Sequence, residues 1–188
     1  MEKPDKNTMR KDFLARRRGI SKEQRAEKSR AIMEKILELD LYKNADWLFC
    51  YIDMGSEVIT TDLIKRAWKD GKRVAVPIAL KDRYMYFVEI STFDNMSRSD
   101  IGVMEPDIAS DRQVYPDNSS LMIVPGSMFD INKNRSGYGG GYYDTYTEKY
   151  NVNNTVGVCY DIQLVKEIPV EPFDRKLKMV ITEKRTIE

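Results

Sequence analysis

Apolar residues in the first 40 positions of the chain recur at helical spacing. Met9 and Phe13 lie one turn apart in a basic segment and predict a first helix. Ser21, with Gln24 three residues later, has the pattern of a capping box, which would start a second helix over about 22–39. The apolar stripe of this second helix is formed by Ala26, Ile32, Met33, Ile36 and Leu37.

Later in the chain, short continuous apolar runs alternate with helical segments. The runs predict strands that are buried on both faces, and they cover residues 47–52, 74–78, 84–90, 121–124, 155–160 and 179–182. Further helices are predicted from Thr60 or Thr61 to Gly71 and over 143–150, and Pro77 places its strand near a sheet edge or strand end. The alternation predicts an α/β fold, a three-layer sandwich with a mainly parallel central sheet.

Ligands of parallel sheets bind beyond the carboxyl ends of the strands, so a site is expected in the loops after Ile52, Ile78, Val124 and Tyr160. The third of these loops reads PGSMFDINKNRSGYGGGYYD. Its glycines lack the Cβ that keeps an anion from the backbone, and the helix that follows presents free N–H groups. The pattern predicts a phosphate cradle, with a structural glycine turn as the alternative. The spacing matches neither Walker A nor the G-x-G-x-x-G fingerprint.

Aromatic and basic residues add candidates that each have two interpretations. Tyr138, Tyr142 and Tyr143 interleave the glycines, where their rings could stack on a purine or pterin or pack in the core. Lys6 and Arg10 are spaced i, i+4, and such like charges disfavour a helix unless an anion joins them. A solvated basic face is the alternative for this pair.

Carboxylates in or beside loops are the remaining candidates. Asp144 falls in the first turn of the helix after the glycines, where it could cap that helix or hold Mg²⁺ beside a phosphate. Glu57 follows the first buried strand and could bond an amidine-like ring edge or move a proton. Position alone also fits a surface or helix-capping acid, and Glu105 and Asp174, in proline-bounded loops, share this ambiguity.

The composition removes several classes of function. With 31 Lys and Arg against 30 Asp and Glu, the net charge of +1 favours a small-molecule partner over nucleic acid or a membrane surface. The absence of histidine excludes Ser-His-Asp and Cys-His systems and most zinc sites. A metal is then expected to be a hard cation such as Mg²⁺, held by one or two carboxylates together with phosphate oxygens.

The chain length fits one domain, residues 1–188, and a monomer is the simplest assumption. Cys50 and Cys159 stand alone inside apolar runs, which predicts buried core residues rather than a disulfide. The segment MEKPDKNTMRKDFLARRR lacks the apolar stretch of a signal peptide, and no apolar run approaches membrane length. These features predict a cytoplasmic protein.

Several motifs together resemble those of the 5-formyltetrahydrofolate cyclo-ligases, also called 5,10-methenyltetrahydrofolate synthetases. In chain order they are KNTMRK, YIDMGSE, GVMEP, VPGSMFDINKNRSGYGGGYYD, CYDIQ, PVEPFD and ITE, and they span nearly the whole sequence. The resemblance implies a Rossmann-like fold of the NagB, RpiA and CoA-transferase type. It also implies the ATP- and Mg²⁺-dependent cyclisation of 5-formyltetrahydrofolate to 5,10-methenyltetrahydrofolate, with release of ADP and phosphate.

The resemblance further implies roles for individual residues. ATP would be held by Lys6, Arg10, Arg135, Ser136, Gly137, Tyr138, Gly139, Gly140, Gly141, Tyr142 and Tyr143. The folate would be bound by Met54, Glu57, Gly139, Gly140, Gly141, Tyr142 and Tyr143, and Mg²⁺ by Asp144 and Asp174. Catalysis would rest on Lys6, Arg10, Arg135 and Glu57. The sequence departs from the family at Lys133 and Ser136, where Gly and Leu are usual, and at Phe173, where His is frequent.

Two other functions remain open at this point. A phosphosugar or acyl-transfer enzyme of the same fold would keep the anion cradle but would not need Mg-ATP. A nucleic-acid or regulatory binding module would use the basic segment MRKDFLARRR and bind oligonucleotides with a steep salt dependence. The near-neutral net charge counts against this second alternative.

Overall fold

The computed structural model describes residues 5–94, 96–99, 102–109 and 112–188. Within these residues an eight-stranded sheet has the order β13-β12-β10-β7-β1-β2-β3-β6. Its strands are β1 (Trp47–Cys50), β2 (Arg73–Ala79), β3 (Met85–Ile90), β6 (Gln113–Val114), β7 (Ser120–Val124), β10 (Thr155–Val158), β12 (Met179–Ile181) and β13 (Thr186–Ile187). The pairs along β12, β10, β7, β1 and β2 are parallel, whereas β3, β6 and β13 pair antiparallel. The predicted mainly parallel sheet is confirmed; the Rossmann-like superfamily label stays a prediction.

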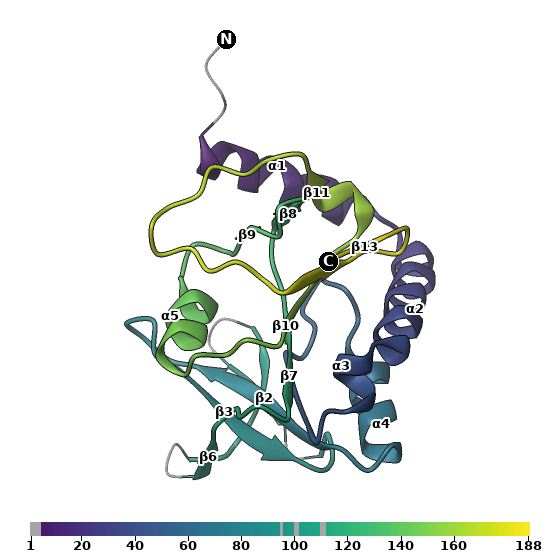
Figure 1. Cartoon of the computed structure of the whole chain (residues 1–188), viewed down its shortest axis with the longest axis vertical. Coiled ribbons are helices and arrows are strands. Elements are labelled where there is room, and N and C mark those ends of the chain that lie inside the picture. Colours follow the sequence, from purple (N-terminus) through teal and green to yellow (C-terminus); the bar gives the residue numbers. More distant parts are fainter. Residues whose placement is uncertain (1–4, 95, 100–101, 110–111) are drawn as a thin grey trace.

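Helices cover both faces of the sheet and give the three predicted layers (Figure 1). On one side lie α2 (Lys22–Glu38), α3 (Asp40–Lys43) and α4 (Thr61–Lys69), and on the other lies α5 (Tyr142–Lys149). Consecutive residues of a strand pack into the hydrophobic cores on opposite faces of the sheet, because side chains alternate across a strand. Leu48 packs with the side chains of α2 and α4, whereas Phe49 packs with Phe129 and Tyr146. This two-sided burial explains why the strands read as continuous apolar runs.

The remaining elements cover the carboxyl ends of the parallel strands. α1 (Lys6–Arg18) packs through Met9 and Phe13 against Met128 and Ile168, and it crosses the top of the molecule in Figure 1. A small sheet joins β11 (Leu164–Val165), β8 (Met128–Asp130) and β9 (Arg135–Ser136), next to the 3-10 helix η2 (Asp161–Gln163). A further hairpin pairs β4 (Met96–Arg98) with β5 (Met104–Pro106). The sequence analysis predicted no strands in these segments.

Local signals placed most of the helix ends correctly. The capping box between Ser21 and Gln24 is present, and Gly71 has the left-handed φ of +77° expected after α4. Pro77 lies beyond Ala75, the last β2 residue in register with β1, so its missing N–H breaks no pairing with β1. Residues 1–4 of the basic N-terminal segment lie outside the described residues. Every helix in the described ranges is too short or too polar to cross a lipid bilayer.

Gly157 on β10 has no side chain, and the buried side chains of Leu177 and Phe129 fill the space beside it. A Cβ at this position would come within 2.5 Å of Leu177 Cδ1 and 2.6 Å of Phe129 Cε1. Gly157→Ala should therefore lower the free energy of unfolding by about 1–3 kcal/mol through overpacking, measured by thermal or urea unfolding. Leu177→Ala opens the same space, so the double variant should be less destabilised than the sum of the two single variants. Additive effects would contradict this explanation.

Candidate active site

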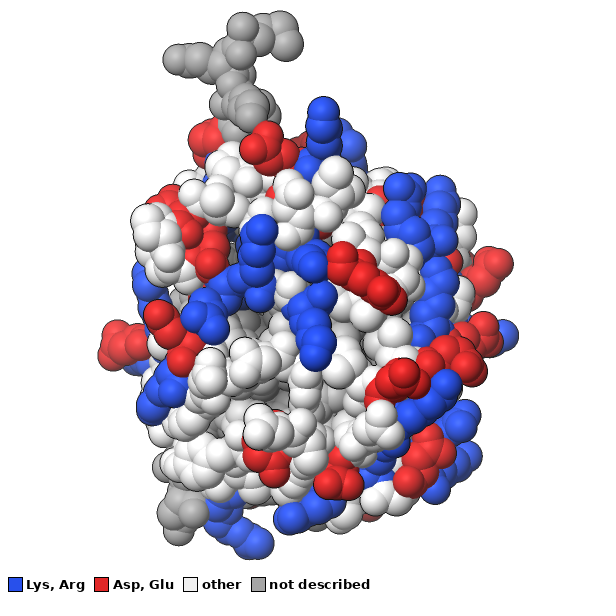
Figure 2. Space-filling model, in the orientation of Figure 1, with Lys and Arg blue, Asp and Glu red and all other residues white. Residues whose placement is uncertain are grey.

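Four segments that are distant in the sequence meet at the carboxyl ends of the parallel strands. They are α1, the loop after β1, the glycine-rich segment between β7 and α5, and the C-terminal segment before β12. Figure 2 shows Lys and Arg side chains gathered in the middle of this face, below α1. The protein thus has a local basic patch although its net charge is only +1.

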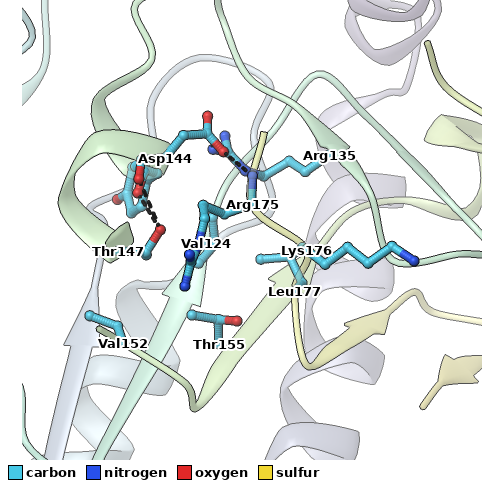
Figure 3. Close-up of a pocket in the computed structure, with 10 residues that line it drawn as sticks. Val124, Arg135, Asp144, Thr147, Val152, Thr155, Arg175, Lys176 and Leu177 are labelled. Atoms are coloured by element: carbon cyan, nitrogen blue, oxygen red, sulfur yellow. Dashed lines mark hydrogen bonds and ion pairs between the residues drawn. The ribbon is translucent and has the colours of Figure 1, made fainter. Parts of the chain in front are cut away.

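Arg135 and Asp144 form the most buried ion pair of the site. Arg135 Nη2 donates to Asp144 Oδ2 at 2.7 Å, and Arg135 Nη1 donates to the carbonyl of Pro125 at 3.4 Å. The other Asp144 oxygen accepts from the backbone N–H of Arg175 at 3.2 Å. The two side chains are 5% and 15% exposed. They line a small pocket together with Arg175 and Lys176; Figure 3 shows the Arg135 side chain directed toward Asp144 and the Lys176 ammonium directed away from it.

Lys6 and Asp174 form a second ion pair beside the first. Lys6 is the first residue of α1, and its ammonium group pairs with Oδ2 of Asp174. That oxygen also accepts from the backbone N–H of Glu171 at 2.8 Å. Because Asp174 immediately precedes Arg175, the contacts run without a break from α1 through the C-terminal segment to Asp144. Four residues that the sequence placed in an ATP and metal site are therefore brought together.

Arg10 holds the glycine-rich segment from the side of α1. Its Nε donates to the carbonyl of Gly137 at 2.9 Å, and its Nη2 donates to Ser136 Oγ at 3.4 Å. Gly139 has a φ of +103° and Gly141, the N-cap of α5, a φ of +69°, which side-chain-bearing residues rarely adopt. The predicted anion cradle thus has the backbone conformation that glycine allows, and Arg10 packs against it from α1.

The tyrosines of this segment have different surroundings. Tyr142 donates its hydroxyl to the carbonyl of Leu80 at 2.8 Å and so ties the start of α5 to the loop after β2. The guanidinium carbon of Arg135 lies 5.7 Å from the centroid of the Tyr143 ring. The hydroxyl of Tyr143 is buried and has no hydrogen-bond partner among the described residues, and burial raises its pKa well above the ordinary range. An unpartnered buried hydroxyl beside the cradle points to a ligand atom.

Glu57 is buried and bonds to Tyr138, which is 46% exposed, on the other side of the cradle. Tyr138 donates its hydroxyl proton to Glu57 Oε1, and the backbone N–H of Met54 donates to Glu57 Oε2 at 2.9 Å. Glu57 is 8% exposed, and this burial raises its pKa, against the lowering effect of its two hydrogen bonds. Met54 is 39% exposed, so it can touch a ligand that reaches Glu57.

Arg17 is the residue of this site that the sequence analysis missed. Its guanidinium is buried and donates to the hydroxyl of Tyr138 at 2.8 Å. The signal that could have found it is spacing, because Arg17 follows Arg10 by seven residues and so shares a helical face with it. The run of three arginines at the end of α1 hid which of them points inward.

The donor set fits Mg²⁺ that arrives with a triphosphate. Mg²⁺ is commonly held by one or two carboxylates plus phosphate oxygens and waters. Asp144 and Asp174 are two such carboxylates, and each is paired with a cation that phosphate would also attract, Arg135 and Lys6. In the described part of the chain, no group of three or more acidic, Cys or His side chains could cage a metal alone. The hydroxyl of Tyr143, which has no hydrogen-bond partner among the described residues, is a further group that a bound ligand could contact.

The fold and the site together define a three-layer α/β protein with a glycine-rich segment and two Lys/Arg–Asp ion pairs at the strand ends. A sequence model of the 5-formyltetrahydrofolate cyclo-ligase family matches residues 2–183. A probable 5-formyltetrahydrofolate cyclo-ligase of Schizosaccharomyces pombe is 31% identical over 173 residues, covering 84% of each protein. The 5-formyltetrahydrofolate cyclo-ligase of Escherichia coli is 28% identical over 178 residues, covering 92% of this chain and 97% of that protein.

A solved structure agrees with these relatives. The NMR structure of Aquifex aeolicus 5,10-methenyltetrahydrofolate synthetase superposes with a TM-score of 0.83 at 26% identity, covering 96% of this chain and 91% of that one. The chain belongs to the 5-formyltetrahydrofolate cyclo-ligase family and is an enzyme of the cyclo-ligase class. The resemblance that the sequence motifs indicated is confirmed.

Proposed function

We propose that the residues gathered around α1 and the glycine-rich segment carry out the family's reaction, the ATP-dependent closure of 5-formyltetrahydrofolate to 5,10-methenyltetrahydrofolate. One observation carries this proposal. Lys6, Arg10 and Arg135 converge on the cradle together with Asp144 and Asp174, so the charges that Mg-ATP requires lie in one place. In this proposal residues 1–188 act as one cytoplasmic domain and as a monomer, with no nucleic-acid or membrane partner.

The triphosphate of ATP is proposed to lie against the cradle. Lys6 and Arg10 approach it from α1, and the backbone amides of residues 135–143 approach it from below. Arg135 uses two of the five N–H groups that a guanidinium offers for protein partners, which leaves donors for phosphate oxygens. The start of α5 adds free N–H groups and the positive end of its dipole.

The folate is proposed to lie on the Glu57 side, next to Met54. A carboxylate has about four lone-pair positions, and Tyr138 and Met54 occupy two of them. The remaining positions can accept two parallel N–H bonds from the amidine-like edge of the pterin, which fixes its orientation. Tyr143, between this carboxylate and Arg135, is placed to meet both substrates.

The chemistry needs no protein nucleophile, which suits a chain without histidine. The formyl oxygen attacks the γ-phosphorus of ATP and ADP leaves. The neighbouring folate N–H nitrogen then attacks the activated formyl carbon and loses its proton to solvent, inorganic phosphate leaves, and the five-membered ring closes. Lys6, Arg10 and Arg135 stabilise the charge on the equatorial phosphoryl oxygens, and Glu57 keeps the folate aligned. Mg²⁺ held by Asp144 and Asp174 would supply further positive charge at the phosphates.

Asp144 provides a specific test of the metal assignment. Asp144→Asn keeps the shape of the side chain but removes its charge, so the Mg²⁺ concentration for half-maximal activity at fixed ATP should rise about tenfold. Asp70→Asn, at the exposed end of α4, is the matched control and should titrate like the parent. If Asp144→Asn also titrated like the parent, Asp144 would be removed from the proposed metal site.

The function itself is tested with the purified full chain, 5-formyltetrahydrofolate and Mg-ATP. Absorbance of the methenyl product should appear only when all components are present, with one ADP released for each product. A folded protein that binds ATP but forms no product would contradict the proposal. Product formed without nucleotide would favour the acyl-transfer type of enzyme.

A further inference from the structure

Arg17 is buried without a carboxylate in direct contact among the described residues. It is 6% exposed and lies near the end of α1. Its Nε donates to Ser56 Oγ at 3.0 Å, and its Nη1 donates to the carbonyl of Gly126 at 3.3 Å and to Tyr138 Oη at 2.8 Å. Removing a cation from water is costly unless its hydrogen bonds and nearby negative charge compensate. The nearby negative charge is that of Glu57, reached through Tyr138.

The directions of these hydrogen bonds follow from the donor and acceptor groups. A guanidinium only donates, so the Tyr138 oxygen accepts from Arg17 and its single proton is directed to Glu57 Oε1. Glu57 Oε2 accepts from the backbone of Met54. Both carboxylate oxygens therefore accept, which is the pattern that stabilises the ionised form.

We propose that Arg17 is a positioning residue for the folate, which acts through Tyr138 to keep the Glu57 carboxylate ionised and fixed in orientation. This inference rests on the proposed function, in which Glu57 meets the ring edge of the substrate. The Nε and Nη1 groups of Arg17 donate to protein atoms, among them the hydroxyl of Tyr138.

The ionisation of Glu57 is a balance of opposing effects. Burial raises the pKa of Glu57, and the nearby charge of Asp53 adds to this, whereas the hydrogen bond from Tyr138 and the charge of Arg17 lower it. The titratable groups that face Glu57 come from α1, from β1 with its loop, from the glycine-rich segment and from the segment that follows β10. They are Arg17, Tyr51, Asp53, Tyr138, Tyr143 and Tyr160, whose hydroxyl donates to the Glu57 carbonyl at 2.9 Å. Arg17 provides the positive charge in this set, so its loss should favour the protonated carboxyl.

The test compares Arg17→Met, which removes the charge but keeps an apolar stem, with Arg17→Lys, which keeps the charge. Arg16→Met is the matched control, because Arg16 is exposed and pairs with Asp12 on the same helix. For Arg17→Met, kcat/KM for 5-formyltetrahydrofolate should fall about tenfold at pH values on the acid limb, where activity follows the ionised fraction of Glu57. The acid limb of the pH profile should move to higher pH, so that activity recovers as pH rises.

Several readouts separate a positioning role from a structural one. In Arg17→Met the KM for ATP should stay within about twofold of the parent, because the change affects the folate side of the site. Arg17→Lys should recover the pH profile of the parent. A loss that is uniform across pH, with an unmoved acid limb, would overturn the proposal. If Arg17→Met does not fold, Tyr138→Phe breaks the same relay with Arg17 in place and should move the limb in the same direction.

A second measurement does not depend on activity. The ¹³C carboxyl resonance of Glu57 in glutamate-labelled protein, assigned by its absence in Glu57→Gln, should titrate at higher pH in Arg17→Met than in the parent. If the parent lacks cyclo-ligase activity but this midpoint moves, the proposed function fails while the coupling of Arg17 to Glu57 stands. If the parent is active and neither the midpoint nor the acid limb moves, the role of Arg17 fails alone.

Discussion

Replacing Arg135 with alanine should lower kcat/KM for ATP by about 10³-fold, the scale on which a transition-state arginine contributes to phosphoryl transfer. Arg135 is 5% exposed and spans from the β8–β9 hairpin to Asp144 at the start of α5. A Cβ at Gly137 would come within 2.8 Å of Arg135 Nη1, so this buried positive charge lies against the glycine-rich segment. The measurement is steady-state methenyl formation with ATP varied at saturating folate.

Two further variants separate this loss from unfolding. Arg135→Lys keeps the charge but not the planar fork, so it should recover only part of the activity. Arg66→Ala, in an exposed pair with Asp70 on α4, should behave like the parent in activity. Because Arg135→Ala leaves Asp144 without its ion-pair partner, thermal unfolding of each variant should accompany the kinetics. If Arg135→Ala kept ATP turnover within about threefold of the parent, the role would be refuted, because removing such a group typically costs far more activity.

Glu57→Gln should lower kcat/KM for 5-formyltetrahydrofolate by about 10²-fold, because the amide nitrogen cannot accept a hydrogen bond and the remaining oxygen accepts without a full negative charge. The effect should fall on the folate rather than on ATP, since Glu57 lies on the side of Tyr138 and Met54. The acid limb that the parent shows in its pH profile should disappear as well, because glutamine does not titrate. The measurement is kcat/KM for folate across pH, with the KM for ATP recorded at each point.

The control for this variant is Glu89→Gln, which removes a carboxylate whose partner is Arg73 on the neighbouring strand. Glu89→Gln should keep the parent's pH profile. If Glu57→Gln retained the acid limb, a group other than Glu57 would be responsible for it. If its KM for ATP rose as much as its KM for folate, Glu57 would not discriminate between the two substrates, and the proposed division of the site would be wrong.

The two predictions address the two halves of one site that α1 connects. Lys6 and Arg10 face the phosphate half through Asp174 and Gly137. Arg17, two to three turns further along, faces the folate half through Tyr138. A single helix face therefore carries cations to both parts of the proposed site, and in this proposal the placement of α1 affects both substrates.

Local sequence patterns predicted the elements that have a periodic or end-specific signal. The apolar stripe and capping box predicted α2, and the apolar run 47–52 predicted β1, each within two residues of its observed end. The strands β8 and β9 were missed because two or three residues are too few to show a period. Consequently the sequence indicated that Arg135 belongs to a glycine-rich loop but not that it sits on a buried hairpin.

By itself the sequence determined the chemistry that is available. It excluded imidazole, supplied the glycines, the basic residues and the carboxylates, and ordered them in motifs typical of a cyclo-ligase. The tertiary structure alone decided the partners, such as Lys6 with Asp174 and Arg17 with Tyr138. The reason is physical, because propensity and periodicity act over a few neighbouring residues, whereas burial and ion pairing depend on segments that the fold brings together from more than a hundred positions apart.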